Sequence, residues 1–186
     1  EGRDKEKIHK IFEAAKSVKD VKVFELEWDE SHNRSLFTIV GSPEDVLASV
    51  FEAMKAATEL IDMESHSGEH PRIGATDVVP FIPISGVSMD ECVEIANKLG
   101  EKVAKELNIP VYLYEAAATK PERENLADVR RGQYEELKEE IKTNPDKKPD
   151  FGSSEFHATA GATVIGARKF LVAYNVNLDT ADVEVA

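Results

Sequence analysis

The sequence predicts an α/β (α+β) sandwich in which a mixed β-sheet carries helices packed on one face. Segments with helical and with strand periodicity alternate along the chain, an order typical of helices laid against a sheet. A chain of 186 residues is long enough for one domain with a sizeable core. Ser42 and Ser88 each precede a helix-starting pattern, so the beginnings of the two long helices are well defined.

The first third of the chain predicts a helix, a strand pair and a second helix. Residues 4–17 repeat apolar side chains at helical spacing, whereas residues 21–28 and 35–41 are rich in β-branched and aromatic side chains. The polar turn DESHNR joins the two strands. Ser42 followed by Pro43 predicts a helix that runs to about residue 63.

The middle of the chain predicts a strand, a helix and another strand. Residues 76–84 contain two prolines, which predicts an edge strand or a bulged strand. Ser88 with Glu91 forms a capping-box pattern for a helix that ends near residue 108, before Pro110. Residues 109–116 then form a strand.

The last third of the chain is less regular. Residues 121–142 are charged and weakly apolar, which predicts one or two short surface helices. Residues 143–154 form a proline-containing loop. Residues 162–178 close the chain as one or two strands, with Gly166 at the bend.

Composition excludes several classes of function. The 23 basic and 36 acidic residues give a net charge of −13, which argues against nucleic acid as a partner. No apolar run approaches the length of a membrane span, so we expect no membrane partner. Cys92 is the single cysteine, which rules out a disulfide framework and fits a cytoplasmic location.

Residues 62–84 form the segment richest in chemistry. His66 and His70 stand with acidic residues and Arg72 in a turn that contains Gly68 and Pro71. A polar surface turn without function is the alternative interpretation. The segment HSGEH also matches the motif of inverted zinc peptidases. That zinc site needs an uninterrupted helix, which Gly68 and Pro71 disfavour, so we predict no metal.

Two further segments carry polar groups beside apolar strands. Residues 29–35 deliver Arg34 to the start of a buried strand, where its guanidinium should find an anionic partner, protein or ligand. Asn33 in the same turn fits a structural role. Residues 150–170 combine glycines with small hydroxylic residues, which let a ligand approach the backbone, yet match neither a P-loop nor a dinucleotide fingerprint.

Together these segments resemble the formiminotransferase family. The similarity rests on DESHNRSLFTIVG, on the run GEHPR-x-G-A-x-D-x-x-PF-x-P, on PVYLYEAAAT and on the run GARKFL-x-A-x-N-x-N-L, which together span nearly the whole chain. The resemblance is to the N-terminal subdomain of the family, which occurs alone or fused to a cyclodeaminase.

The resemblance implies a ferredoxin-like N-terminal subdomain over residues 1–178 and, over residues 179–186, the start of a linker to a C-terminal subdomain. It implies transfer of the formimino group from N-formimino-L-glutamate to N5 of tetrahydrofolate, the co-substrate, without a metal. A second copy of the chain, in a homodimer, is a further expected partner. The alternatives are a non-catalytic folate-binding or subdomain-pairing module and, less favoured, a zinc metallohydrolase.

The resemblance also assigns site residues. His70 matches the catalytic histidine, and Arg34, Arg72, Arg168 and Glu27 are candidates for substrate binding. Glu27 stands where relatives often carry aspartate, and Ala160 where some carry tryptophan. The folate-binding stretch falls on Gly152, Ser153, Ser154, Glu155, Phe156, His157, Ala158, Thr159, Ala160 and Gly161.

Overall fold

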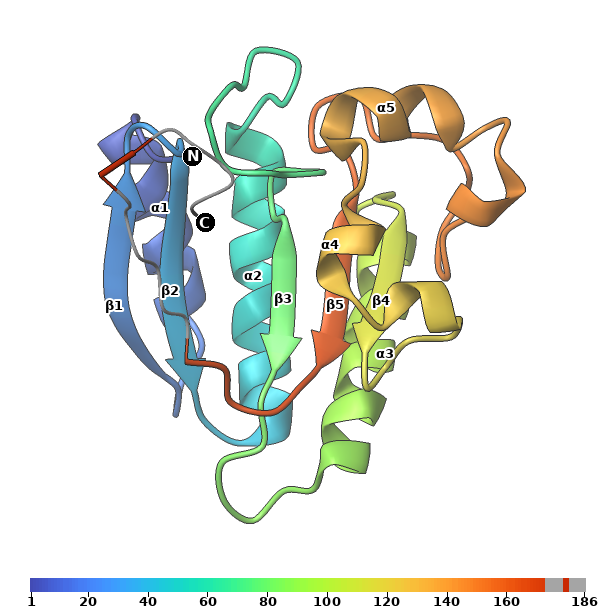
Figure 1. Cartoon of the computed structure of the whole chain (residues 1–186). Helices are drawn as coiled ribbons and strands as arrows, with labels where there is room; N and C mark the ends of the chain where they lie inside the picture. Colours follow the sequence, from blue (N-terminus) through green and yellow to red (C-terminus); the bar gives the residue numbers. More distant parts are fainter. Residues whose placement is uncertain (173–178, 181–186) are drawn as a thin grey trace.

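The computed structural model describes residues 1–172 and 179–180. Helices and strands alternate along this part of the chain, as the sequence predicts, in two small sheets backed by long helices (Figure 1). The α+β class is therefore confirmed. The predicted boundary at residue 178 falls on residues outside the described part, as does most of the predicted closing strand after residue 172.

The N-terminal third is a helix, a hairpin and a second helix. Helix α1 (Lys5–Lys16) begins at Asp4, whose carboxylate accepts hydrogen bonds from two backbone amides of the first turn. Strands β1 (Lys22–Asp29) and β2 (Arg34–Val40) pair antiparallel, with an irregularity between Phe24 and Glu27. These elements agree with the predicted ranges to within two residues.

Helix α2 (Pro43–Leu60) packs against α1 and lies behind both sheets. The Ser42 hydroxyl donates to the Asp45 carboxylate at 2.5 Å and caps no backbone amide, so the predicted hydroxyl cap is replaced by a side-chain contact. The helix ends three residues before the predicted Met63 because Ile61 adopts an extended conformation.

The second sheet is parallel and has the order β3-β5-β4. Strand β3 (Val78–Phe81) is an edge strand, as the prolines of residues 76–84 predict. Strand β5 (Thr163–Ala167) lies between β3 and β4 (Val111–Glu115). Helix α3 (Met89–Glu106) covers one face and starts with the predicted capping box of Ser88 and Glu91. In the described residues the facing edges of β2 and β3 are not hydrogen-bonded to each other.

Gly166 lies inside β5, not at the predicted bend. A Cβ atom at this position would come within 2.4 Å of the Tyr114 ring and 2.5 Å of the Tyr114 carbonyl oxygen on the neighbouring strand. Glycine is therefore required by the close approach of β4, and the prediction that it bends the chain is wrong.

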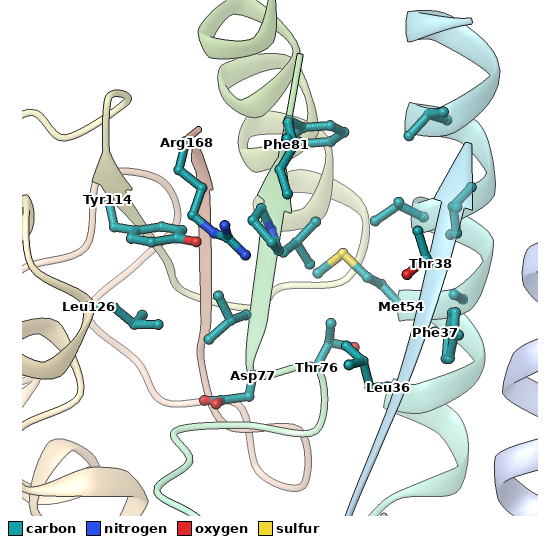
Figure 2. Close-up of a pocket in the computed structure, with 18 of the residues that line it drawn as sticks. Leu36, Phe37, Thr38, Met54, Thr76, Asp77, Phe81, Tyr114, Leu126 and Arg168 are labelled. Carbon is teal, nitrogen blue, oxygen red and sulfur yellow. The ribbon is translucent and has the colours of Figure 1, made fainter. Parts of the chain in front are cut away.

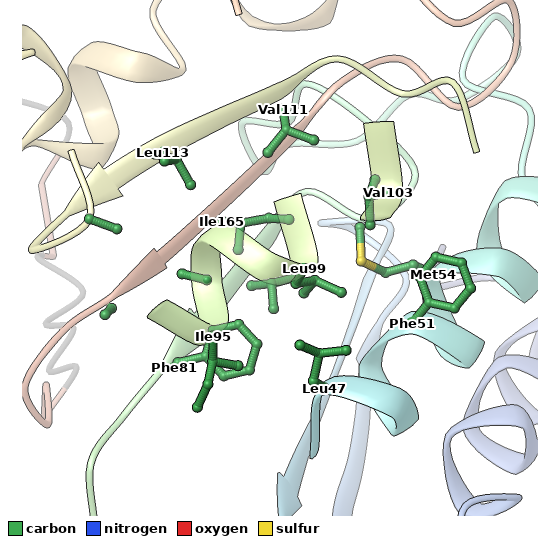
Figure 3. Packing of buried hydrophobic residues seen from close by; sticks show 14 of the residues in the cluster. Leu47, Phe51, Met54, Phe81, Ile95, Leu99, Val103, Val111, Leu113 and Ile165 are labelled. Carbon is green, nitrogen blue, oxygen red and sulfur yellow. The ribbon is translucent and has the colours of Figure 1, made fainter. Parts of the chain in front are cut away.

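The main core fills the space between α2, α3 and the parallel sheet (Figure 3). Leu99, Val103, Val111 and Ile165 are fully buried there. Burial of side chains of this size stabilises the fold by roughly 1.5–3 kcal/mol each. This core fixes the strand ends from which the site residues project.

Short helices follow β4, as expected for residues 121–142. They are the 3₁₀ turn η1 (Pro121–Arg123), α4 (Leu126–Val129) and α5 (Gln133–Glu140), and a further 3₁₀ turn, η2 (Pro145–Lys147), lies in the loop after them. Leu137 of α5 is buried in a cluster with Tyr112 and Val164, so this segment packs on the face of the parallel sheet that α3 leaves open. No helix among residues 1–172 is both long and apolar enough to cross a bilayer.

A buried ion pair anchors the loop that leads back to β5. Arg123 contacts the carboxylate of Asp150, and the two side chains are only 6% and 8% exposed. Asp150 also accepts a hydrogen bond from the backbone amide of Leu113 at 2.7 Å. The pair thereby fixes the position where the small-residue segment 152–161 begins.

Candidate active site

The loop of residues 61–77, between α2 and β3, contacts both of the other polar segments that the sequence analysis singled out. It is irregular apart from one isolated bridge between Gly74 and Gly161. On one side it contacts the hairpin turn of residues 30–33, and on the other the segment 152–161. Three segments far apart in sequence therefore meet at this loop.

Asn33 attaches the hairpin turn to the loop. Its amide nitrogen donates to the Ser67 carbonyl at 2.9 Å, and its own carbonyl accepts a hydrogen bond from His66 Nε2 at 2.9 Å. The residue is buried with φ 49°, a left-handed conformation that asparagine tolerates better than most residues. Gly68 is needed in the same place, because a Cβ atom there would lie 2.4 Å from the His32 carbonyl oxygen.

Backbone hydrogen bonds attach the loop to the small-residue segment. The amides of Met63 and Ala75 donate to the carbonyls of Thr159 and Ala160 at 2.8 and 2.9 Å. The ring of Phe156 meets Tyr134 of α5 edge-on at 5.0 Å between centroids. The predicted folate-binding stretch thus lies directly beside the loop that carries His70.

His157 shapes the turn within this segment. Its Nδ1 accepts hydrogen bonds from the amides of Thr159 and Ala160 at 3.3 and 3.0 Å, which requires an unprotonated nitrogen. Burial lowers the pKa of His157 and favours that state. Gly152 and Gly161 have φ of 90° and 73°, positive values that glycine adopts without the steric penalty of a side chain.

His70 lies half-buried where the loop passes the start of β2. Its Nε2 is 3.0 Å from Nη1 of Arg34, and its ring meets that of His32 edge-on at 6.2 Å between centroids. Burial lowers the pKa of His70, and the positive charges of Arg34 and Arg130 lower it further, whereas Asp77 opposes them. These effects favour the neutral imidazole, which can accept a proton near neutral pH.

Arg72 is directed into the protein. Its guanidinium donates to both carboxylate oxygens of Glu135, at 2.8 and 2.6 Å, and to the His66 carbonyl at 3.0 Å. The side chain is only 11% exposed. A substrate carboxylate would therefore have to compete with Glu135 for Arg72.

Arg130 and Asp77 line the hollow with His70 and were not predicted as site residues from the sequence. Arg130 donates to the Asp77 carboxylate at 2.7 Å and to the Pro71 carbonyl at 3.2 Å, while Asp77 accepts a hydrogen bond from the Ile73 amide at 2.9 Å. The position of Asp77, immediately before a buried strand, was the available signal. Arg130 gave none, because it stands among the charges of a surface segment.

The same region opens into a hollow of about 1930 Å³ between β2 and β3. His70, Arg34 and Arg168 line it together with Tyr114 and Asp77. Figure 2 shows the Arg168 side chain, at the end of β5, reaching toward Tyr114. Burial raises the pKa of Tyr114, whereas the nearby Arg168 opposes that shift.

Glu27 lies outside this hollow, on the exposed side of β1, where it lines a small depression that Arg34 also borders. The HSGEH segment is not helical, so the geometry of an inverted zinc peptidase is not formed. Within residues 1–172 and 179–180 no three metal-ligating side chains are grouped to hold an ion.

The comparison with protein families gives one match, to the N-terminal subdomain of the formiminotransferase domain, over residues 1–168. The relatives include a glutamate formimidoyltransferase of Streptococcus pyogenes, 47% identical, and one of Thermoplasma acidophilum, 49% identical. Each match takes in the whole of this chain but 62% and 61% of those relatives.

A formimidoyltransferase-cyclodeaminase of Rattus norvegicus is 48% identical over 96% of this chain and 33% of its own length. The chain therefore spans about 60% of the single-activity relatives and a third of the fused one. The family resemblance inferred from the motifs is confirmed by all of these matches. The chain belongs to the formiminotransferase family and corresponds to its N-terminal subdomain.

Proposed function

We propose that this chain provides one half of a glutamate formimidoyltransferase, which transfers the formimino group from N-formimino-L-glutamate to N5 of tetrahydrofolate. The observation that carries the proposal is that His70 is a half-buried imidazole in contact with Arg34 and His32, and that it borders a hollow that Arg168 also lines. Membership of the family supplies the reaction, and the lengths of the relatives suggest that a C-terminal subdomain completes the site.

The proposed chemistry needs proton transfer and no covalent nucleophile. N5 attacks the formimino carbon and forms a C–N bond, and His70 accepts the proton that N5 loses. The tetrahedral intermediate then breaks its bond to the glutamate nitrogen, which takes a proton from the His70 imidazolium. Because the first step requires a free base, the lowered pKa of His70 suits it to this role at neutral pH.

We propose that the remaining predicted residues bind the folate and the formimino substrate. Segment 152–161, with its small side chains beside the loop of His70, would accept the flat pterin of the folate. Arg34 and Arg168 are exposed to the hollow and can hold carboxylates of the substrates. Glu27, which borders Arg34, would face the cationic formimino group, whereas Arg72 would contribute only by exchanging Glu135 for a substrate carboxylate.

The test is a two-subdomain protein in which this chain replaces the corresponding part of the Streptococcus pyogenes relative. His70→Ala should reduce the rate of 5-formiminotetrahydrofolate formation by a factor of about 100 to 10,000, the usual range for a general acid–base group. His9→Ala, on the exposed side of α1, is the matched control and should retain the rate. Undiminished turnover in His70→Ala would refute the catalytic role.

A non-catalytic folate-binding module is the second candidate, since the chain covers only part of its relatives. Calorimetric titration of this chain with 5-formyltetrahydrofolate, repeated with Arg168→Ala, separates the two. Binding by this chain without turnover in the two-subdomain protein would favour the binding module. Turnover that depends on His70 would favour the enzyme.

A further inference from the structure

The hydrogen bond between Arg34 and His70 can have only one direction. A guanidinium is always protonated and can only donate, so at 3.0 Å the Nε2 atom of His70 must be the acceptor. The lone pair on Nε2 is therefore occupied in this structure. While the contact lasts, that nitrogen cannot take a proton from a substrate.

The other charged groups around His70 have partners. Arg130 is paired with Asp77, and the ring of His32 contacts the Asp29 carboxylate through Nδ1 at 2.8 Å. Arg72, in the same loop, is paired with Glu135. Within the described residues neither Arg34 nor Arg168 has an ion pair, and both line the hollow, but of these two Arg34 is the one that donates to His70. An incoming carboxylate can therefore reach Arg34 without breaking an existing ion pair.

We propose that Arg34 couples substrate binding to the availability of His70: it occupies Nε2 in the free protein, and a substrate carboxylate draws it away and leaves Nε2 free to accept a proton. The inference rests on the proposed function and adds a positioning role for Arg34. The ligand class is a carboxylate of a small dicarboxylic acid, as in N-formimino-L-glutamate.

Electrostatics acts in the same direction. Burial is the largest cause of the lowered pKa of His70, and Arg34 is the next. A carboxylate bound to Arg34 would neutralise its charge as well as remove the hydrogen bond, so the pKa of His70 would rise when the substrate is in place. Arg130 would continue to lower that pKa, while Asp77 would continue to oppose it. His70 would thus become the stronger base when a reactant is present.

The experiment is an NMR titration of the histidine ring nitrogens in this chain, with and without saturating glutarate at constant ionic strength. In the unchanged protein, glutarate should move the His70 midpoint upward. In Arg34→Gln the midpoint should already be higher without glutarate and should not move when it is added. Arg34→Lys, which keeps the charge, should restore a low midpoint.

Arg131→Gln is the matched control, since Arg131 is an exposed arginine paired with Asp128 and should leave the His70 titration unchanged. The His66 signals, which report the hydrogen bond to Asn33, verify that each variant keeps the loop folded. An unchanged midpoint in Arg34→Gln, no response to glutarate in the unchanged protein, or an equal response in both would overturn the inference. None of these readouts uses turnover, so the proposal can fail while His70 remains catalytic.

Discussion

Replacing Arg123 with Met should destabilise this protein strongly. The substitution leaves the Asp150 carboxylate, 8% exposed, without its positive partner, although the Leu113 amide and the Thr119 hydroxyl still donate to it. Breaking a buried pair by removing one partner costs about 3–5 kcal/mol. Methionine keeps most of the apolar stem of Arg123 but removes the guanidinium, whose carbon lies 5.1 Å from the centre of the Tyr112 ring.

The assay is urea unfolding followed by circular dichroism. With an m-value of about 2 kcal/mol per molar, the expected loss moves the midpoint down by about 1.5–2.5 M. Arg131→Met is the matched control, because its ion pair with Asp128 is exposed and should be worth less than about 1 kcal/mol. The double variant Arg123→Met with Asp150→Asn should recover part of the loss, since no unpaired charge remains. A midpoint shift below about 0.5 M in Arg123→Met would refute the reasoning.

Two further predictions concern the sheet and the small-residue segment. Gly166→Ala should lower the urea midpoint markedly, because the new methyl group would overlap the Tyr114 ring and backbone. Ala167→Gly on the same strand is the comparison. An unchanged midpoint in Gly166→Ala would show that β4 and β5 can separate. For His157, whose pKa is lowered from 6.5 by burial, the unfolded state binds more protons just below pH 6.5, so stability should fall as the pH drops through that value. His157→Asn retains an acceptor for the amides of Thr159 and Ala160 without titrating, so its urea midpoint should fall less than that of the unchanged protein between about pH 7.5 and pH 5.5; equal falls would contradict this role.

The secondary structure was predictable because its signals are local. The capping box at Ser88, the prolines of residues 76–84 and the apolar period of α3 each act within a few residues, and the structure confirms all three predictions. The predictions failed where contacts between residues far apart in sequence determine the local structure. Gly166 looked like a bend from its neighbours in sequence, but the ring of Tyr114, on an adjacent strand, is what requires a glycine there.

The candidate site shows the same division. Loop character, the polar side chains of residues 62–77 and the small residues of 152–161 could be seen in the sequence. The partner of Arg72 could not, because Glu135 is 63 residues away in a segment that looked like a solvent-exposed helix. Residues 121–142 were predicted as surface helices, yet Arg130 and Glu135 supply the charges that hold the loop of His70.

The loop of His70 is irregular, so its shape depends on the segments around it more than on its own hydrogen bonds. Asn33 fixes it to the hairpin, Thr159 and Ala160 fix it to the small-residue segment, and Arg130 holds the Pro71 carbonyl next to His70 itself. A change in any one of these contacts should reorient the imidazole without touching it. The position of His70 is therefore a property of the whole fold, and the substitutions that test the fold and those that test the site act on one connected set of contacts.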